Sequence, residues 1–367
     1  MHISSFSLRN FRSFTDVQIE GISPTLSVVA APNATGKTNF LEAIHIVLRG
    51  KSFRSPHETC VRWGEDLFFL KAVIENGENQ SQIHAQYHVP SRRLRIEENR
   101  VPVSPIALYT EFPLVLFLPD DTFLFLRGPS MRRNFLNQAL SSSPSYLSAI
   151  VQYSRALKQR NTALKTAKSP EDIAHWTALL NEQATSIWAS RDTLVSFMNH
   201  HLPTLYHSLF GGSENVEVKL SRGLPDGSDL ATALAGGWEY EQRYRYTLYG
   251  PHRDDLEVLI DGRPAQNSLS RGQMRMLVLS LKLGVFQFMK KVGGKAPIVL
   301  LDEVLSELDA DRQQHLLEHL PEAQIFLTCT AVPEAVKNRD DAKILNLQEL
   351  LLPAAKTPIQ EKVAVHV

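Results

Sequence analysis

The sequence contains very little cysteine. Only Cys60 and Cys329 occur in 367 residues, far apart and without a third ligand at metal-binding spacing. A disulfide framework needs several cysteines at short spacings, and a structural zinc site needs paired Cys or His ligands. The two thiols therefore argue against both arrangements and suit a reducing cytosol.

Long apolar runs and an excess of either charge are also missing. No apolar run approaches the roughly 20 residues that span a membrane, so we expect no membrane partner. The start MHISSFSLRNF lacks the charged and then apolar pattern of a signal peptide, which predicts a cytoplasmic protein. Lys and Arg number 39, as do Asp and Glu, so a polyanion would have to be bound through local basic clusters.

A segment near the N-terminus has the pattern of a phosphate-binding loop. The run 25–31, TLSVVAA, is short and β-branched like a buried strand, and 40–48, FLEAIHIVL, has helical spacing of apolar residues. The loop between them therefore opens a helix, whose N–H groups attract an anion. Lys37 can reach the β- and γ-phosphates of ATP, and the Thr38 hydroxyl can ligate Mg²⁺. The predicted nucleotide-binding residues of this loop are Ala31, Pro32, Asn33, Ala34, Thr35, Gly36, Lys37 and Thr38.

Two positions of this loop depart from the usual pattern. Ala31 replaces the usual first glycine, and Ala34 stands at a second position that is often glycine. Alanine is penalised sterically in left-handed backbone conformations that glycine adopts freely. A loop that has lost nucleotide is therefore an alternative, although Gly36, Lys37 and Thr38 favour binding.

A second set of motifs lies more than two hundred residues further on. Ser270 precedes the apolar run 274–286 and predicts a helix N-cap, with Gln273 as its capping-box partner. Gly272 leaves the backbone bare beside the cap, so this helix start suits a γ-phosphate. The phosphate loop and this second set each carry half of one ATP site. Such a split implies an ATPase whose site is completed between two copies of the chain.

The run 296–304, APIVLLDEV, predicts a parallel strand covered on both faces. Asp302 and Glu303 follow at its carboxyl end, where open α/β sheets bind ligands. We expect Asp302 to hold Mg²⁺ through its water shell and Glu303 to polarise the attacking water as the catalytic residue. Thr328 or Thr330, at the end of the next predicted strand, is a further candidate for contact with the γ-phosphate.

Further ordered blocks extend the pattern along nearly the whole chain. They are LRNFRSF at 8–14, FLEAI at 40–44, RGPSMRRNFL at 127–136, YGPHRDD at 249–255, and LLDEVLSELD at 300–309. Together with the phosphate loop and SRGQ, these blocks resemble the RecF family of bacterial DNA-repair proteins. That family belongs to the ABC-type ATPases, with the SMC and Rad-type DNA-end proteins.

The resemblance implies an ATP-dependent homodimer on single- and double-stranded DNA at gaps and junctions. It implies at most a weak, DNA-stimulated ATPase that works with RecR and RecO to load RecA in replication maintenance, DNA repair and the SOS response. It also implies that Arg12 and Asn39 lie at the nucleotide. The residues implied to face the ATP of the other copy, or the dimer seam, are Ser270, Arg271, Gly272, Gln273 and Asp309.

The expected fold is an α/β ABC-type P-loop ATPase head with a mixed sheet and an inserted helical lobe that forms a short antiparallel arm. We assign residues 1–117 and 240–350 to the ATPase lobe, 118–239 to the helical lobe, and 351–367 to a loosely ordered tail. Gly77 predicts a hairpin turn, and Ser169 predicts the start of a long helix. The second arm helix is expected to pack on this long helix through Leu147, Ile150, Val151, Leu157 and Leu164.

Local basic clusters are the candidates for DNA contact. They are Lys51, Arg54, Arg93, Arg95, Arg132 and Arg133. Strand-like alternation would place Arg93 and Arg95 on one face. The roles of His252 and Arg253 stay open, and an ABC transport ATPase and a non-hydrolysing structural relative are the alternative functions.

Overall fold

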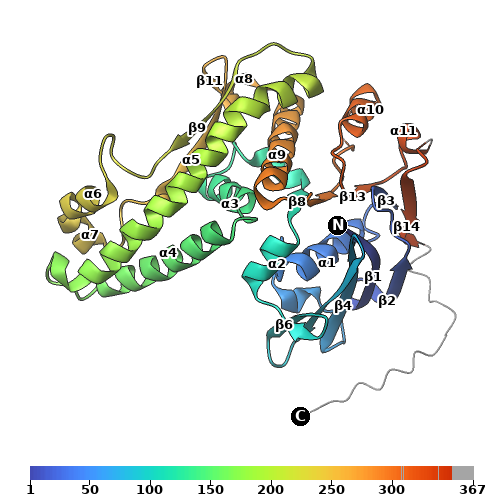
Figure 1. The fold of residues 1–367 in the computed structure, drawn as a ribbon, viewed down its shortest axis with the longest axis horizontal. Coiled ribbons are helices and arrows are strands. Elements are labelled where there is room, and N and C mark those ends of the chain that lie inside the picture. The colour runs from blue at the N-terminus through green and yellow to red at the C-terminus, as the bar shows by residue number, and fades with distance from the viewer. Residues whose placement is uncertain (307, 309, 338, 349–367) are drawn as a thin grey trace. The chain divides into compact units, whose positions relative to one another are not determined.

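The computed structural model describes residues 1–306, 308, 310–337 and 339–348. The chain forms two compact units: unit 1 contains Met1–Val103 and the segment from Gln324 onward, and unit 2 contains Ser104–Ala323 (Figure 1). The predicted tail 351–367 and Asp309 lie outside the described residues. The predicted division into an ATPase lobe and a helical lobe stays a prediction. Within the described ranges, no helix has the length and apolar character needed to cross a bilayer.

Unit 1 contains a six-stranded antiparallel sheet in the order β2-β1-β4-β5-β6-β7. Its strands are β1 His2–Phe11, β2 Phe14–Glu20, β4 Leu67–Asn76, β5 Asn79–His88, β6 Arg93–Glu98 and β7 Val101–Pro102. Burial alternates residue by residue along β4, as expected for a sheet with one covered face. Asn76 pairs with Asn79 across a turn in which Gly77 has a φ of 63°, so the predicted hairpin is confirmed.

Parallel strands form the second part of unit 1. Strand β3, Leu26–Ala30, lies between β13, Ile325–Cys329, and β14, Ala342–Asn346, and is parallel to both. Helix α1, Lys37–Arg49, follows β3 directly, and α11 is Glu334–Lys337. The Phe40 ring of α1 packs edge-on against Phe6 of the antiparallel sheet and Phe326 of β13, with centroids 5.8 and 6.2 Å away. Helix α1 therefore packs through aromatic contacts against both sets of strands.

A long helical hairpin dominates unit 2 (Figure 1, green). Helix α3 is Pro129–Ala139, α4 is Pro144–Ala163, and α5 is Ala174–Phe210 after the 3-10 turn η3 at Pro170–Ile173. The Ser169 capping box ahead of η3 confirms the predicted helix start. Helix α4 packs on α5, as expected.

The predicted packing stripe on α4 is wrong. The buried positions are Tyr146, Ala149, Tyr153, Ala156 and Arg160. Val151 is exposed, and Leu147, Ile150 and Leu157 are only partly buried, which leaves Leu164 as the one correct member. Small alanines allow close helix approach, while the tyrosines and Arg160 find polar partners in the core, so hydrophobicity alone selected the wrong face.

Short strands and one buried helix complete unit 2. Strand β8, Leu114–Phe117, pairs in parallel with β12, Ile298–Leu301, and α9, Arg271–Gly293, is buried along most of its length. The antiparallel strands are β9 Val216–Ser221, β10 Asp255–Ile260 and β11 Arg263–Pro264. The shorter helices are α2 Pro105–Glu111, α6 Leu230–Gly236, α7 Trp238–Tyr244, α8 Ala265–Ser268 and α10 Ala310–Glu318.

Buried ionic groups hold these elements together. The Asp254 carboxylate accepts hydrogen bonds from Trp188 Nε1 at 2.9 Å, Arg191 Nη1 at 2.5 Å and the Gly223 N–H at 2.7 Å. Nearby, the His252 ring contacts the Tyr153 hydroxyl at 2.6 Å, and burial lowers the pKa of His252 to about 4. The YGPHRDD block therefore joins α4, α5 and β10 through a neutral histidine and a paired carboxylate.

The buried pair of Arg160 and Glu241 gives a stability prediction. Arg160 Nη2 donates to Glu241 Oε2 at 2.6 Å, and both side chains are almost fully buried. Glu241→Ala should lower the free energy of unfolding of unit 2 by about 3–5 kcal/mol, because it leaves a buried guanidinium without its counter-charge. Urea unfolding followed by tryptophan fluorescence measures this loss. Glu239→Ala, on the exposed face of the same helix, should stay within about 0.5 kcal/mol of the wild type; equal losses in both variants would refute the interpretation.

Candidate functional site

The loop between β3 and α1 presents a row of backbone donors. Among the residues that the structure describes, the N–H groups of positions 33–36 have no hydrogen-bond acceptor. Gly36 is the N-cap of α1 with a φ of 103°, and neither a side-chain cap nor an acidic residue occupies the first turn. Donors that converge at an uncapped helix start favour an anionic ligand, because the helix dipole adds to their partial charges.

Lys37 lies within this loop. Its side chain is 4% exposed, and Nζ donates to Ala31 O at 2.8 Å, to Pro32 O at 3.4 Å and to Asn33 Oδ1 at 3.2 Å. The Thr35 hydroxyl donates to Pro32 O at 2.7 Å and braces the same turn. The oxygen acceptors compensate for the burial of the ammonium group, so a positive charge is held beside the unpaired N–H groups.

The two alanines of the loop differ in their effect. Ala31 has no left-handed backbone, and its N–H donates to Cys329 O at 3.2 Å, so it continues the strand without strain. Ala34 has a φ of 65°, a conformation that costs a non-glycine residue roughly 1–2 kcal/mol. Gly36 cannot be replaced as easily, because an added Cβ would lie 2.9 Å from Ser13 Oγ. Ala31 is therefore accommodated without strain, and Ala34 is the strained one of the two alanines.

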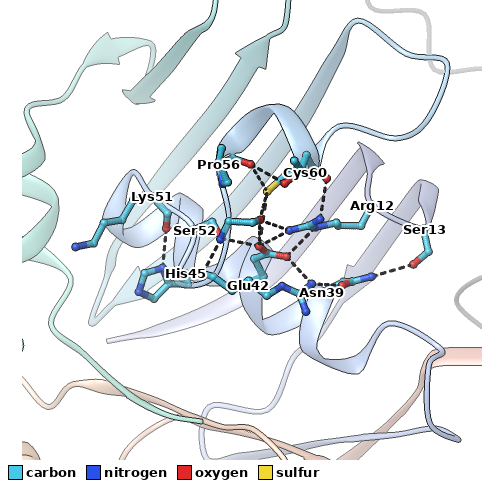
Figure 2. Close-up of polar contacts among 12 residues, drawn as sticks. Arg12, Ser13, Asn39, Glu42, His45, Lys51, Ser52, Pro56 and Cys60 are labelled. Atoms are coloured by element: carbon cyan, nitrogen blue, oxygen red, sulfur yellow. Dashed lines mark hydrogen bonds and ion pairs between the residues drawn. The ribbon is translucent and has the colours of Figure 1, made fainter. Parts of the chain in front are cut away.

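A buried carboxylate organises the side chains next to the loop (Figure 2). Glu42 is fully buried on α1 and accepts hydrogen bonds from Arg12 Nε and Nη2 at 2.9 and 2.8 Å, from Arg54 Nη2 at 2.8 Å and from the Ser52 hydroxyl at 2.6 Å. Arg54 also donates to Asn39 Oδ1 in the first turn of α1. Arg12 and Asn39, both predicted at the nucleotide, thus belong to one network with Arg54.

The charge of Glu42 is stabilised by these donors. Burial alone would raise the pKa of this carboxyl, but the hydrogen bonds from Arg12, Arg54 and Ser52 outweigh it and lower the pKa to about 2. The Cys60 thiol lies 3.6 Å from Glu42 Oε1. Burial, as the larger cause, and the negative charge of Glu42, as the second, raise the pKa of Cys60 to about 11. Cys60 is therefore an unreactive thiol. Sequence analysis missed Glu42, whose only signal is an acid among the apolar residues of the helix.

The helix start at Ser270 has the predicted geometry. The Ser270 N–H donates to Gln273 Oε1 at 2.9 Å, and the Gln273 N–H donates to Ser270 Oγ at 3.4 Å, which confirms the capping box. Ser270, Arg271 and Gly272 are exposed. A Cβ at Gly272 would meet nothing closer than Arg312 Nη1 at 3.9 Å, so the fold of the chain does not itself require glycine here.

The acidic pair follows strand β12 as predicted. Asp302 is 3% exposed, and its N–H donates to Phe117 O at 3.0 Å. Glu303 has a φ of 47°, a strained conformation of the kind that occurs at functional sites. Arg275 Nη2 donates to the carbonyl oxygens of Glu303 at 2.8 Å and Val304 at 2.9 Å and so holds this turn. Arg275, which the sequence motifs did not single out, lies on the helix that Ser270 caps.

The remaining predicted residues are the basic candidates for DNA contact and two threonines. Arg132 pairs with Asp255 through two hydrogen bonds of 2.6 and 2.9 Å, and Arg133 donates to Asp254 O at 3.1 Å, so both serve the interior of unit 2. Lys51, Arg93 and Arg95 are exposed. Arg93 and Arg95 alternate along β6 and share a face, although Arg95 pairs with Glu97. Thr328 is buried in β13, and Thr330 is exposed just beyond it.

The phosphate loop and the Glu42 network belong to unit 1, while the capped helix and the acidic pair belong to unit 2.

Residues 2–348 match the family described as RecF/RecN/SMC N terminal domain, which defines an ABC-type ATPase head with mixed α/β architecture. A solved structure of the recombination mediator protein RecF with ATP, from the RecFOR pathway, is 26% identical and has a TM-score of 0.83 over 91% of this chain and 93% of that one. A second RecF structure, described with ATPrS, is 25% identical with a TM-score of 0.82 over 94% and 96%.

Curated relatives narrow the class further. The DNA replication and repair protein RecF of Ruminiclostridium cellulolyticum is 32% identical over 347 residues, which cover 90% of this chain and 93% of the relative. The chain belongs to the RecF family. This assignment favours the RecF hypothesis over a transport ATPase.

Glu42 leads to a pH prediction. Its pKa is about 2 in the folded protein against an ordinary value of 4.5, so its stabilising effect is complete above pH 4.5 and is lost as the pH falls toward 2. Glu42→Gln should be less stable than the wild type at neutral pH. Between pH 4.5 and 2 the unfolding free energy of this variant should change less than that of the wild type, and the difference between the two changes should be up to about 3 kcal/mol. Urea unfolding at stepwise pH tests this. Glu78→Gln, at the exposed hairpin turn, should keep the wild-type pH dependence; a Glu42→Gln curve parallel to the wild type would contradict the assignment.

Proposed function

We propose that this protein binds ATP with Mg²⁺, dimerises in response, and acts on DNA during replication and repair. The observation that carries the proposal is the phosphate loop: unpaired N–H groups at an uncapped helix start, with the Lys37 ammonium held beside them. Relatives named as DNA replication and repair proteins, and a RecF structure described with ATP, support it. The alternative with an impaired nucleotide loop is less favoured, because Ala31 is accommodated without strain and the N–H groups of positions 33–36 lack an acceptor among the described residues.

Mg²⁺ fits the oxygen donors that the chain offers. Thr38 lies partly exposed in the first turn of α1, and Asp302 directly follows strand β12. Mg²⁺ commonly takes one or two protein oxygens and completes its shell with water and phosphate oxygens. Within the described ranges, no cluster of three or more His, Cys, Asp or Glu side chains offers a softer metal a site of its own. Thr38 and Asp302 are therefore the proposed ligands, and the ion would neutralise phosphate charge.

The exposed start of α9 is proposed to bind the ATP of a second copy. Ser270, Arg271, Gly272 and Gln273 combine a satisfied cap with open space at the glycine, which suits contact with a phosphate from outside the chain. Nucleotide bound by one copy would then supply an anion to the other copy, so ATP favours the dimer by mass action. Asp309, proposed near the same seam, lies outside the described residues.

Glu303 is the proposed catalytic residue. Arg275 fixes its backbone, and its carboxylate would polarise the attacking water. At most a weak, DNA-stimulated ATPase is proposed, in which hydrolysis releases the dimer.

The proposed partners in the cytoplasm are single- and double-stranded DNA at gaps, together with RecR, RecO and RecA. Lys51, Arg93 and Arg95 are better placed for DNA contact than Arg54, Arg132 and Arg133, which are engaged within the fold.

Variants of the loop lysine and the catalytic acid test the proposal. Lys37→Ala should weaken ATP binding more than tenfold and abolish ATP-induced dimers, because the phosphate loses its cationic partner. Glu303→Gln should bind ATP and accumulate as dimer, because hydrolysis no longer resets it. Light scattering with and without ATP and gapped duplex, together with labelled-ATP binding, gives both readouts. Lys71→Ala on β4 serves as the control. Equal dimerisation by the wild type and Lys37→Ala would reject the mechanism.

The open space at Gly272 gives a sharper test of contact with a second copy. Gly272→Ala should keep the stability and ATP affinity of the wild type but lose at least tenfold in ATP-induced dimerisation, since the added methyl group would obstruct only an external ligand. Gly293→Ala in the same helix is the matched control, because its Cβ would also fit, with Ser142 Cβ at 3.7 Å. If Gly272→Ala dimerises like Gly293→Ala, the capped helix does not meet the nucleotide.

A further inference from the structure

Helix α7 of unit 2 is anchored on one side only. Trp238 packs against the small core of Leu164, Ala167 and Ile173 at the end of α4. The Gln242 amide donates to Ala167 O at 3.4 Å, and Glu241 is buried against Arg160. Figure 1 shows α7 beside this end of the helical hairpin. The side of α7 that carries these residues is therefore fixed, and the remaining side chains face outward.

Two tyrosines are exposed on the outward side, and a third, partly buried tyrosine continues the row. Tyr240 and Tyr244, four residues apart and thus on one helix face, are 49% and 45% exposed, with ring centroids 4.3 Å apart. The Tyr246 ring continues the row 6.2 Å from Tyr244. Arg245 makes this possible, because its left-handed backbone, with a φ of 63°, ends the helix and its Nη1 donates to Leu164 O at 2.6 Å.

Arginine side chains lie over the same rings. Arg243 Cζ is 5.5 Å from the Tyr244 centroid, and Arg253 Cζ is 5.1 Å from the Tyr246 centroid. Both arginines are exposed, and neither forms an ion pair with any described residue. The acids next to these arginines in the chain are exposed Glu239, Glu241, which pairs with Arg160, and Asp254 and Asp255, which pair with Arg191 and Arg132. The outward surface is therefore aromatic and positively charged, with a single exposed carboxylate on α7.

This combination favours one class of ligand. Exposed rings stack on unpaired bases, and arginines beside them neutralise phosphates; the pair of features is typical of sites for single-stranded nucleic acid. The bases of a duplex are stacked on each other and offer these rings no face. Protein interfaces are also rich in tyrosine and arginine, so a protein is the competing occupant, and unchanged single-strand affinity in the tyrosine variants below would point to it.

We infer that Tyr240, Tyr244 and Tyr246, with Arg243 and Arg253, form a binding site for single-stranded nucleic acid on unit 2. We name this surface the tyrosine row. It shares no residue with the proposed ATP site and needs no nucleotide. Single-stranded DNA is among the partners proposed above, and the tyrosine row would be a site for it that does not depend on the ATP-induced dimer. Its role would be to hold the unpaired strand of a substrate that contains one.

The test measures binding of the full-length protein to a fluorescein-labelled oligothymidine of about 20 nucleotides, by anisotropy and without ATP. Tyr240→Ala and Tyr244→Ala should each weaken binding about tenfold, in line with the loss of one stacked base. Tyr244→Phe should bind like the wild type, because it keeps the ring. Arg243→Gln should lower the slope of log affinity against log salt by about 0.7, as expected for one lost phosphate contact.

Controls separate this site from other effects. Phe123→Ala removes a ring of similar exposure, 41%, that also lies under an arginine, Arg127 at 5.0 Å, and it should leave binding unchanged. Circular dichroism checks that each variant folds. Lys37→Ala should bind the single strand normally, so failure of the ATP proposal would leave this result intact.

Photocrosslinking locates the bound strand directly. An oligonucleotide with 5-iodouracil should crosslink to the peptide that contains residues 240–246. Unchanged affinity in Tyr244→Ala, an equal loss in Tyr244→Phe, or crosslinks confined to other peptides would each overturn the inference.

Discussion

The backbone donors at the start of α1 are the constraint on which the proposed chemistry depends. No side chain caps this helix, and the N–H groups of positions 33–36, in the loop that leads into it, have no acceptor among the described residues. This arrangement carries a positive potential that a bound phosphate relieves. The position of α1 is set by Phe40, whose ring contacts both sheets of unit 1, so the core of the unit determines where these donors lie.

Buried carboxylates play a comparable part in each unit. Glu42 holds Arg12 and Arg54 beside the first turn of α1, Asp254 holds Arg191 and Trp188, and Glu241 holds Arg160. A buried charge is tolerated only with a counter-charge and well-formed hydrogen bonds, so each carboxylate fixes the position of its arginine. Arg54, a candidate for nucleic-acid contact in the sequence, is engaged in this way by Glu42. Arg243 and Arg253 form no ion pair with the described residues, and the tyrosine row depends on that difference.

Local patterns were sufficient for most elements that carry the motifs. The β-branched run at β3, the capping boxes at Ser169 and Ser270 and the turn at Gly77 lie where predicted, because each depends on residues within a few positions of one another. The α4 stripe was predicted wrongly for the opposite reason. Which face of a helix is buried depends on partners such as Thr247 and Glu241, which lie more than 80 residues away from Arg160. The environment of Ala34 needed the structure as well, since its steric penalty depends on a backbone angle.

The sequence by itself determined the phosphate loop, the capped helix, the acidic pair and their membership of one ATPase family, because these motifs are contiguous and their chemistry depends on spacing along the chain. Only the tertiary structure decided that Glu42 gathers Arg12 and Arg54, that Arg275 supports Glu303, and that exposed Tyr240 and Tyr244 form a row with Tyr246 beside two arginines. These outcomes depend on which charges are buried together. Burial is a property of the packed chain, and no short segment contains it.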